Sequence, residues 1–312
     1  MLLNRTGSSF PVGKVDFMTL YPVSFEEYLQ AADERLYRAY QMIDEIMAVP
    51  EVIHQQLIDA YKVYLVLGGM PEVVSTYLDT RNWSDVKTVQ GAILQSYSLD
   101  FAKHISNKDI PRVFQVWGNL QDQLAREDKK FRYADIQKGG RAREYEGAIE
   151  WLCLAGLVYR VSAIETPRLP LSAYKKSNAF KLYLNDVGLL GRKFDLDATT
   201  VLMGDNLFTE FKGVIAENYV LQSLVRQFGN QHYYWTSGNT AEVEFVLQDT
   251  GRIIPIEVKA DKNVTAKSLA YYRKQYTPQL SIRLSILNMR KDGDLLNLPL
   301  YLVDKLKFFC SL

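Results

Sequence analysis

Two glutamates and a lysine occupy neighbouring strand-like segments near the C-terminus. Glu244 lies in one alternating apolar segment, and Glu257 and Lys259 lie in the next. The turn between the segments is short and contains Gly251, so we expect the two strands to be antiparallel neighbours. Side chains two positions apart in a strand share a face, so Glu257 and Lys259 point together. Glu217, on the preceding helical segment, is placed to add a third carboxylate.

These residue types suit metal-assisted hydrolysis of a phosphodiester. Carboxylate oxygens hold Mg²⁺, which usually keeps several waters, and a lysine can orient the attacking water. In this interpretation Glu244 and Glu257 bind Mg²⁺ and Lys259 supports the nucleophile. Glu217 is then an outer ligand or a ligand of a second metal. Two alternatives give the same pattern: a solvent-exposed alternating strand, or a former site kept as a buried ion-pair network.

A basic segment lies in the middle of the chain. Residues 126–143 hold seven basic and three acidic side chains. They span a short predicted helix over 133–138, a Gly-Gly turn and the start of a longer helix over 141–155, with a strand expected over 157–161. This order is the outline of a winged helix-turn-helix, expected over about 126–162. We expect Lys138, Arg141 and Arg143 to contact DNA phosphates. The alternative is a packing module whose charges face water.

Composition narrows the function classes. The 37 Lys and Arg nearly balance the 36 Asp and Glu, which excludes a field over the whole protein that steers it to nucleic acid or membrane. No apolar run is long enough to span a bilayer, and two distant cysteines do not make a disulfide framework, so we expect a cytoplasmic protein. The chain also lacks GxSxG, GxGxxG and GxxxxGK[ST] motifs, which disfavours serine hydrolases, dinucleotide enzymes and complete P-loop enzymes.

Apolar periodicity predicts an α+β protein. A buried strand is expected over 15–23, followed by a helix that begins with a capping box of Ser24 and Glu27. Helices are expected over 53–66 and 83–100, with a Gly-Gly-Met-Pro helix stop and restart at 68–71. From residue 194 onward helices and strands alternate. We therefore expect three parts: residues 1–60, a helical region over 61–204 that includes the winged-helix-like segment, and a compact α/β domain over 205–312.

An ordered set of motifs resembles one family. The segments Glu242-Val243-Glu244-Phe245 and Pro255-Ile256-Glu257-Val258-Lys259, preceded by Glu217-Asn218 and Tyr234-Trp235, resemble the C-terminal region of bacterial and archaeal AAA-type ATPases. That region is domain of unknown function 4143 and is similar to PD-(D/E)xK nucleases. Three further stretches fit the same family: residues 181–190, the Gly-Gly-Met-Pro-Glu turn over 68–72, and residues 9–29, which resemble the end of an ATPase core.

The resemblance implies a C-terminal effector region that acts on DNA or docks to it, with a protein partner as the other expectation. An active Mg²⁺-dependent endonuclease and a catalytically silent interaction module both remain open. In the family, the Walker A loop and the acidic Walker B strand come before this point, and this chain starts after both. ATP is therefore implied only for the full-length family context, with no ATP-binding residue in this chain. Glu244 replaces the usual aspartate, which lengthens the ligand arm by one methylene.

Overall fold

The computed structural model describes residue 16 and residues 18–106, 108–203, 209–238, 241–260 and 266–312. The fold is α+β, as expected, with a helical N-terminal part followed by a sheet. The helices are α1 (Phe25–Ala32), α2 (Glu34–Gln41), α3 (Glu51–Leu67), α4 (Pro71–Thr80), α5 (Trp83–His104), α6 (Ile110–Leu124), α7 (Tyr133–Ile136), α8 (Ala142–Leu154), α9 (Val187–Lys193), α10 (Ala198–Met203), α11 (Thr209–Phe228), α12 (Lys267–Tyr276) and α13 (Leu306–Ser311), with 3-10 turns η1 (Leu171–Tyr174) and η3 (Leu300–Lys305).

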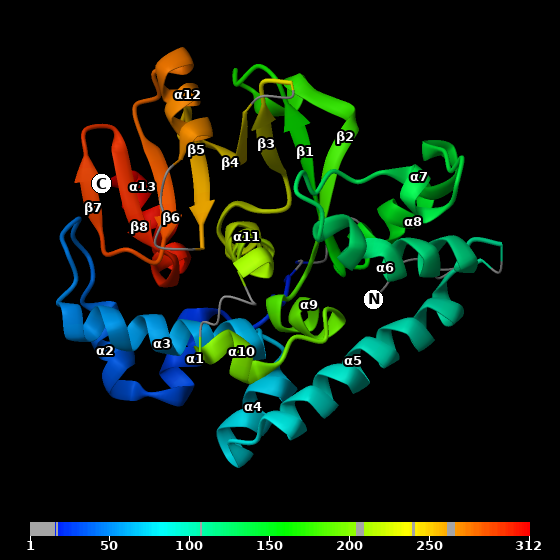
Figure 1. Ribbon diagram of the computed structural model, residues 1–312, viewed down its shortest axis with the longest axis horizontal. Helices are drawn as coiled ribbons and strands as arrows, with labels where there is room; N and C mark the ends of the chain where they lie inside the picture. Colours follow the sequence, from blue (N-terminus) through cyan, green and yellow to red (C-terminus); the bar gives the residue numbers. More distant parts are fainter. Residues whose placement is uncertain (1–15, 17, 107, 204–208, 239–240, 261–265) are drawn as a thin grey trace.

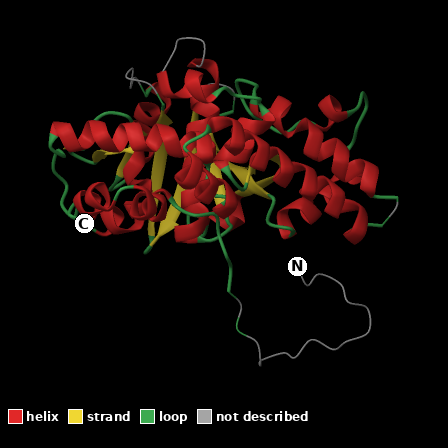
Figure 2. Cartoon of the chain, turned by 90° about the horizontal axis from the view of Figure 1, so that it is seen from below, coloured by secondary structure: helices red, strands yellow, loops and turns green. Residues whose placement is uncertain are grey.

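Within the described residues, eight strands form one mixed sheet. They are β1 (Val158–Ile164), β2 (Lys175–Leu184), β3 (His232–Thr236), β4 (Glu242–Asp249), β5 (Arg252–Lys259), β6 (Ser281–Ser285), β7 (Arg290–Asp292) and β8 (Leu295–Pro299). Their spatial order is β2-β1-β3-β4-β5-β6-β8-β7. The β4–β5 pair is antiparallel, as the short turn predicts, whereas β5, β6 and β8 run parallel. Helices lie on both sides of the sheet (Figures 1 and 2).

The sheet crosses the boundary expected near residue 204. Strand β1 pairs in parallel with β3, from Val161 opposite His232 to Ile164 opposite Trp235. The antiparallel β1–β2 hairpin thereby extends the C-terminal strands, and Figure 1 shows both sets in one continuous sheet. The two halves of the chain consequently share backbone hydrogen bonds.

Two predictions concern the residues before and at the start of α1, and the structure confirms one of them. The capping box is confirmed: Glu27 N–H donates to Ser24 Oγ at 3.2 Å, and Ser24 N–H donates to Glu27 Oε2 at 2.7 Å. The strand expected over 15–23 is wrong for residue 16 and residues 18–23, which have no regular secondary structure. Met18 and Leu20 are 94% and 91% exposed. Among residues 16 and 18–23, the one strand-like contact is the 2.7 Å hydrogen bond from Val23 N–H to Gly69 O. These apolar residues therefore do not pair with a neighbouring strand.

A close junction fixes the helical layer to the sheet. Gly68 ends α3 with φ +70°, and Asp186 caps α9 by accepting from Leu189 N–H at 2.9 Å. A Cβ on Gly188 would lie 2.1 Å from Leu67 O, and one on Gly68 would lie 2.2 Å from Asp186 Oδ1. Only glycine permits these two turns to approach so closely.

Residues near the C-terminus form hydrogen bonds with α1 and α2, the first helices of the chain. Asp304 accepts from Glu26 N–H at 3.3 Å, and Lys305 Nζ donates to the Tyr40 carbonyl at 2.9 Å, at the C-terminal end of α2. Asn288, after β6, exchanges two hydrogen bonds of 2.9 and 2.7 Å with the Val49 backbone, just before α3. These contacts place α3 across the carboxyl ends of β5, β6 and β8.

Candidate functional site

A buried network of carboxyl and ammonium groups lies between α11, β2, β4 and β5. We call it the carboxylate–lysine cluster; its members are Lys129, Lys181, Tyr183, Glu217, Glu242, Glu244, Glu257 and Lys259. Lys259 Nζ lies 2.6 Å from Glu257 Oε1, and the Glu257 side chain is almost fully buried. Glu244 Oε2 accepts from the Val258 backbone N–H at 3.3 Å, which links β4 to β5 beyond the last residue pair of their ladder.

Glu244 lies at a β-bulge in β4. Tyr233 of β3 pairs with Val246 of β4, but Trp235 pairs with Val243. Two residues of β4, Glu244 and Phe245, therefore lie opposite the single residue between Tyr233 and Trp235. A bulge of this kind redirects a side chain from the regular alternation and often lies next to functional sites.

Glu217 is held by two partners from distant segments. Lys129 Nζ lies 2.9 Å from Glu217 Oε1, and the Tyr183 hydroxyl donates to Glu217 Oε2 at 2.9 Å. Lys129 has φ +50°, a left-handed backbone conformation that costs free energy for a non-glycine residue. Burial by itself raises the pKa of Glu217, but Lys129 and Lys181 hold this pKa below its usual value. Glu217 is thus an ionised, fully partnered carboxylate.

Lys181 forms the other end of the cluster. Its side chain is 1% exposed, it pairs with Glu242, and its Nζ lies 4.8 Å from the centre of the Tyr234 ring. A lysine so deeply buried keeps its charge only when it is paired. Beside Glu242 opens a groove of about 510 Å³ that the segment 126–132 lines on one side and Ser268 of α12 on the other. Of the cluster, Glu242 lines this groove.

The two remaining carboxyl groups, Glu244 and Glu257, have raised pKa values. Burial, reinforced by the neighbouring Glu257, raises the pKa of Glu244 to about 8. Burial likewise raises the pKa of Glu257, although Lys259 opposes the shift. Glu257 Oε2 is buried and has no hydrogen-bond partner among the described residues. Burial and mutual repulsion thus favour the protonated form of Glu244, whereas Lys259 favours the ionised form of both carboxyl groups.

The structure brings together all four carboxylate and lysine residues that the sequence analysis selected: Glu217, Glu244, Glu257 and Lys259. Sequence reasoning missed the roles of Lys129, Tyr183 and Glu242 as their partners. Lys181 was noted only as part of a motif. Lys181 and Tyr183 lie in the buried second half of β2, where the other residues are apolar, and a lysine in such a stretch signals a buried partner.

The cluster provides two carboxyl groups that could bind a divalent cation, which is fewer than a complete set of protein ligands. Among the described residues, no group of three His, Cys, Asp or Glu is arranged to hold a metal. Glu244 and Glu257 adjoin each other, and Glu257 Oε2 lacks a partner. Two carboxylates suit Mg²⁺, which commonly binds through one or two protein carboxylates and retains its waters. The residues fit such an ion only if Glu244 releases its proton on binding.

The predicted DNA contacts lie elsewhere, at the turn between α7 and α8. Lys138, Arg141 and Arg143 are all exposed there. The helix, turn, helix and strand expected over 133–161 form as α7, α8 and β1. The loop between β1 and β2 is not free, because Leu171 is buried and its N–H donates to Gln248 Oε1 at 3.0 Å. The Trp235 indole also donates to the carbonyl of Glu165, in the same loop, at 2.9 Å.

Two family models match parts of the chain. Residues 58–200 match a domain of unknown function, DUF8612, and residues 212–301 match another, DUF4143. The second match covers Glu217, Glu244, Glu257 and Lys259, and the first covers Lys129 and Lys181. No curated protein and no solved structure gives a significant match to the chain. None of the described helices is both long and apolar enough to cross a membrane.

Proposed function

We propose that this chain is a DNA-docking module that binds the phosphate backbone through the turn between α7 and α8. One observation carries the proposal: Lys138, Arg141 and Arg143 are exposed within a few residues of each other, and none has an ion-pair partner among the described residues. The order α6, α7, α8, β1, β2 matches a winged helix-turn-helix, which places its second helix in the major groove. Because the β1–β2 loop is bonded to β3 and β4, the DNA contacts would come from the turn and from α8.

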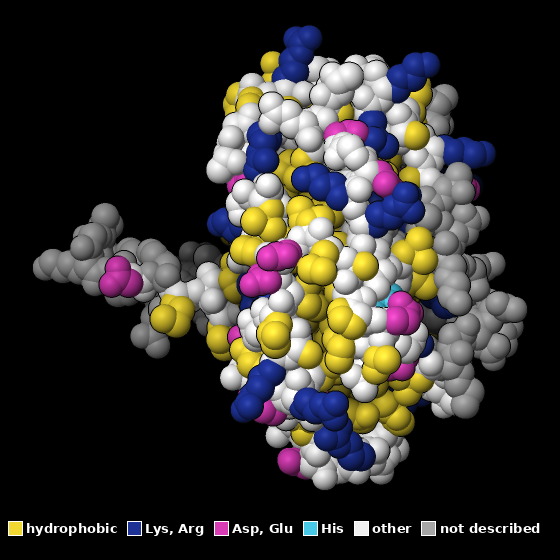
Figure 3. All heavy atoms as spheres, turned by 90° about the vertical axis from the view of Figure 1, so that its left-hand side faces the viewer, with side chains coloured by type: hydrophobic (Ala, Val, Ile, Leu, Met, Phe, Trp, Pro, Cys, Tyr) yellow, Lys and Arg dark blue, Asp and Glu magenta, His cyan; other side chains and the backbone are white. Residues whose placement is uncertain are grey.

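The charge on other surfaces supports this location. Figure 3 shows the face on the β7 side, where Lys and Arg side chains are interspersed with Asp, Glu and apolar residues. A surface of mixed sign does not attract a polyanion as a basic patch does. The motifs that resemble the C-terminal regions of AAA-type ATPases fit a module that tethers a larger protein to DNA.

Salt dependence tests the proposal. A fluorescent DNA duplex is titrated with the wild-type chain and with a variant carrying Lys138→Gln, Arg141→Gln and Arg143→Gln, at several salt concentrations. We expect the slope of log affinity against log salt to fall by about 2–3 in magnitude, since each lost phosphate contact contributes about 0.9. The matched control, Arg35→Gln with Lys274→Gln and Lys291→Gln, removes the same charge from other exposed positions. Equal binding by both variants would refute the proposal and would favour a protein, rather than DNA, as the partner of this chain.

A second candidate function is metal-dependent cleavage of DNA at the carboxylate–lysine cluster, favoured by the adjoining buried carboxyl groups of Glu244 and Glu257 next to Lys259. Glu244 and Glu257 would hold Mg²⁺, which when bound supplies Lewis-acid stabilisation of the phosphate charge. Lys259 Nζ, fixed by Glu257 at 2.6 Å, is positioned to orient a water, and the groove beside Glu242 admits the strand. Glu217 stays paired with Lys129 and Tyr183 and acts by holding the cluster together.

Nicking of supercoiled plasmid with Mn²⁺ or Mg²⁺ tests this second function. Activity should disappear in both Glu257→Ala and Lys259→Ala and persist in Glu72→Ala, an exposed glutamate on α4. Calorimetric titration with Mn²⁺ gives an independent readout, because Glu257→Gln should abolish metal binding. Activity that survives both alanine variants, or a wild-type chain that does not bind Mn²⁺, would reduce the cluster to an ionic scaffold.

A further inference from the structure

An exposed aromatic ring lies next to the groove beside Glu242. Tyr271 of α12 is 50% exposed, and its ring centre lies 6.1 Å from that of Trp235, with the two ring planes 28° apart. Ser268, which lines the groove, comes one helical turn before Tyr271 on α12. Side chains three positions apart are neighbours on the surface of a helix. The Tyr271 ring therefore borders the groove.

The ring is supported from behind by a fixed tryptophan. Trp235 of β3 is completely buried, and its indole N–H donates to the Glu165 carbonyl at 2.9 Å. The rings of Tyr272 and Tyr276 meet Trp235 edge-on, with ring centres 5.1 and 5.8 Å away. Because Tyr271 is stacked on this support, it has less side-chain freedom to lose when a planar ligand binds, which favours binding.

The groove carries balanced charge, and several of its ionic groups are already paired. Glu242 pairs with the buried Lys181, and Asp128 pairs with Arg132 at 2.6 Å, in a partly exposed pair that is weak enough to exchange with a ligand. A groove of this kind does not concentrate phosphates as a basic patch does. Its carboxylates accept and its guanidinium groups donate hydrogen bonds, which matches the donors and acceptors on the edge of a nucleobase. The charged side chains that line it are Arg126, Lys130, Arg132, Glu127, Asp128 and Glu242.

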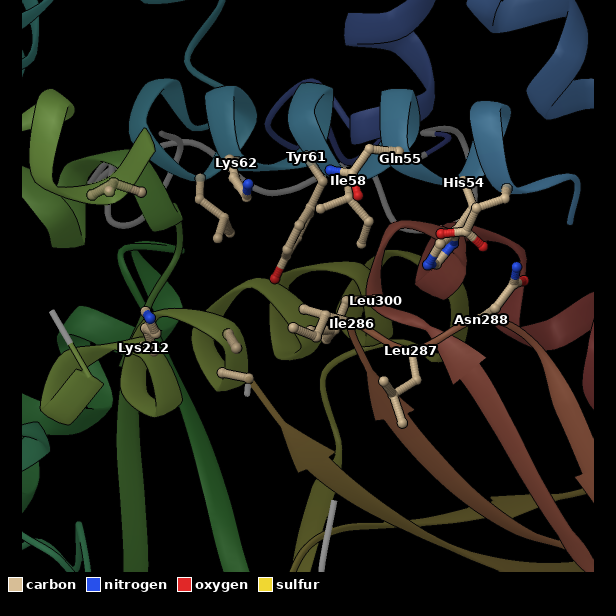
Figure 4. A pocket seen from close by; sticks show the side chains of 15 residues that line it. His54, Gln55, Ile58, Tyr61, Lys62, Lys212, Ile286, Leu287, Asn288 and Leu300 are labelled. Atoms are coloured by element: carbon tan, nitrogen blue, oxygen red, sulfur yellow. The ribbon is translucent and has the colours of Figure 1, made fainter. Parts of the chain in front are cut away.

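A second hollow lies where α3 crosses the carboxyl ends of β5, β6 and β8 (Figure 4). Its volume is similar, about 560 Å³ against about 510 Å³ for the groove. Ile58, Ile286 and Leu300 lie in its middle, so the polar edge of a base placed there would lack hydrogen-bond partners at that point. Buried donors and acceptors without partners cost free energy. The groove therefore suits a base better than this cavity does.

We propose that the groove and the Tyr271 ring together bind an unpaired base of a single DNA strand. The base stacks on the exposed side of the ring, and its edge forms hydrogen bonds with side chains that line the groove. Stacking of bases on aromatic side chains is how many proteins bind single strands. Bases within an intact duplex are paired and stacked, so they do not reach the ring. The inference deepens the proposed function by naming the form of DNA, and it rests on that function only in taking DNA as the ligand.

Binding to a single strand tests the role of Tyr271 on the full chain. The probe is a labelled strand of about 12 nucleotides, within the site sizes of known single-strand binders, with one 2-aminopurine, whose fluorescence falls when it stacks. We expect the wild type to bind the strand and quench this fluorescence. Tyr271→Ala should weaken binding about tenfold and abolish the quenching, since one stacking contact contributes affinity of that order. Tyr271→Phe should retain both. Tyr174→Ala, which removes a 38% exposed tyrosine on η1, is the matched control.

Two further variants separate stacking from folding and from the docking turn. Tyr271→Leu keeps an apolar cover over Trp235 without an aromatic face, so it should bind as weakly as Tyr271→Ala while its thermal unfolding stays near that of the wild type. The triple variant at Lys138, Arg141 and Arg143 should lose affinity for a blunt duplex but keep the Tyr271-dependent quenching.

The outcomes distinguish this inference from the proposed function. A wild-type chain that does not bind the single strand, or binding that Tyr271→Ala leaves unchanged, overturns the inference, whether or not a duplex binds at the turn between α7 and α8. Tyr271-dependent binding of the single strand without any binding of the duplex supports the inference and overturns the proposed docking turn instead.

Discussion

The backbone N–H of Gly69 donates a hydrogen bond of 2.6 Å to Asp186 Oδ2, across 117 residues of sequence. The same carboxylate caps α9 through Leu189 N–H. The Gly-Gly-Met-Pro-Glu turn and the motif containing Asp186 are therefore the two sides of one packed junction. The residues of these two segments therefore have a structural role in joining α3 to α9.

Replacing Gly188 with alanine tests how tightly this junction is packed. The added Cβ would lie 2.1 Å from Leu67 O, a backbone atom that cannot move without shifting α3. We expect Gly188→Ala to lower the free energy of unfolding by about 2–4 kcal/mol. Gly147→Ala is the control, since its Cβ meets nothing within 4 Å and it lies inside α8, where alanine should stabilise by about 0.5–1 kcal/mol. Equal effects of the two variants in urea unfolding would contradict the close approach.

His232 should make the protein sensitive to acid. Burial lowers the pKa of His232 to about 4, so the folded state binds its proton less readily than the unfolded state, whose pKa is near 6.5. The stability from neutral His232 is full above pH 6.5 and is lost as pH falls toward 4. At pH 5 we expect a loss of about 2 kcal/mol relative to pH 8. His232→Gln should remove that part of the pH dependence, as urea unfolding at both pH values would show; an unchanged slope would mean that His232 titrates normally.

The Lys129–Glu217 pair should behave as a unit. Lys129→Met leaves Glu217 buried without its ion-pair partner, so we expect a loss of about 3–5 kcal/mol in the free energy of unfolding. Adding Glu217→Gln should recover most of this loss, because the amide keeps a partner in the Tyr183 hydroxyl. A double-mutant cycle by chemical denaturation measures the coupling. Additive effects of the two substitutions would show that the pair contributes no coupling.

The shared sheet predicts that the C-terminal part does not fold alone. In a fragment of residues 205–312, β3 would lose its partner β1 and become an edge strand, although His232 to Thr236 are all buried in the full chain. Exposed apolar edges promote aggregation. We expect a larger share of this fragment than of the full chain to sediment after expression. A soluble fragment with cooperative unfolding would establish that the β1–β3 ladder is dispensable.

Sequence reasoning succeeded where partners are close in the chain. The Ser24–Glu27 capping box and the β4–β5 hairpin each depend on a few adjacent residues, so their patterns suffice. The hairpin brings Glu244, Glu257 and Lys259 together. The strand expected before Ser24 failed because apolar residues specify burial only when a neighbouring surface exists to cover them.

Long-range pairing could not be read from the sequence. Lys129 lies 88 residues before Glu217, and the two meet because the segment before α7 is bonded to β2 through Phe131 N–H and Phe180 O, beside α11. Parallel pairing between strands of different segments leaves no local signal in turn chemistry or periodicity. The register shift in β4 at Glu244 and Phe245 depends likewise on pairing with β3. Exposed residues such as Lys138 and Arg143 could be placed on the surface, because charged residues are rarely buried unpaired.

The contacts from Asp304 to Glu26 and from Lys305 to Tyr40 bear on how the protein is made in the cell. They join residues 278 and 265 positions apart. At about 5–20 residues per second, a ribosome needs roughly 15–50 s to add the intervening chain. During that time α1 and α2 have left the ribosome without their final partners. The time needed for synthesis, rather than diffusion, therefore sets the earliest moment at which Asp304 and Lys305 can contact α1 and α2. During that interval, chaperones that bind exposed apolar helices can act on α1 and α2.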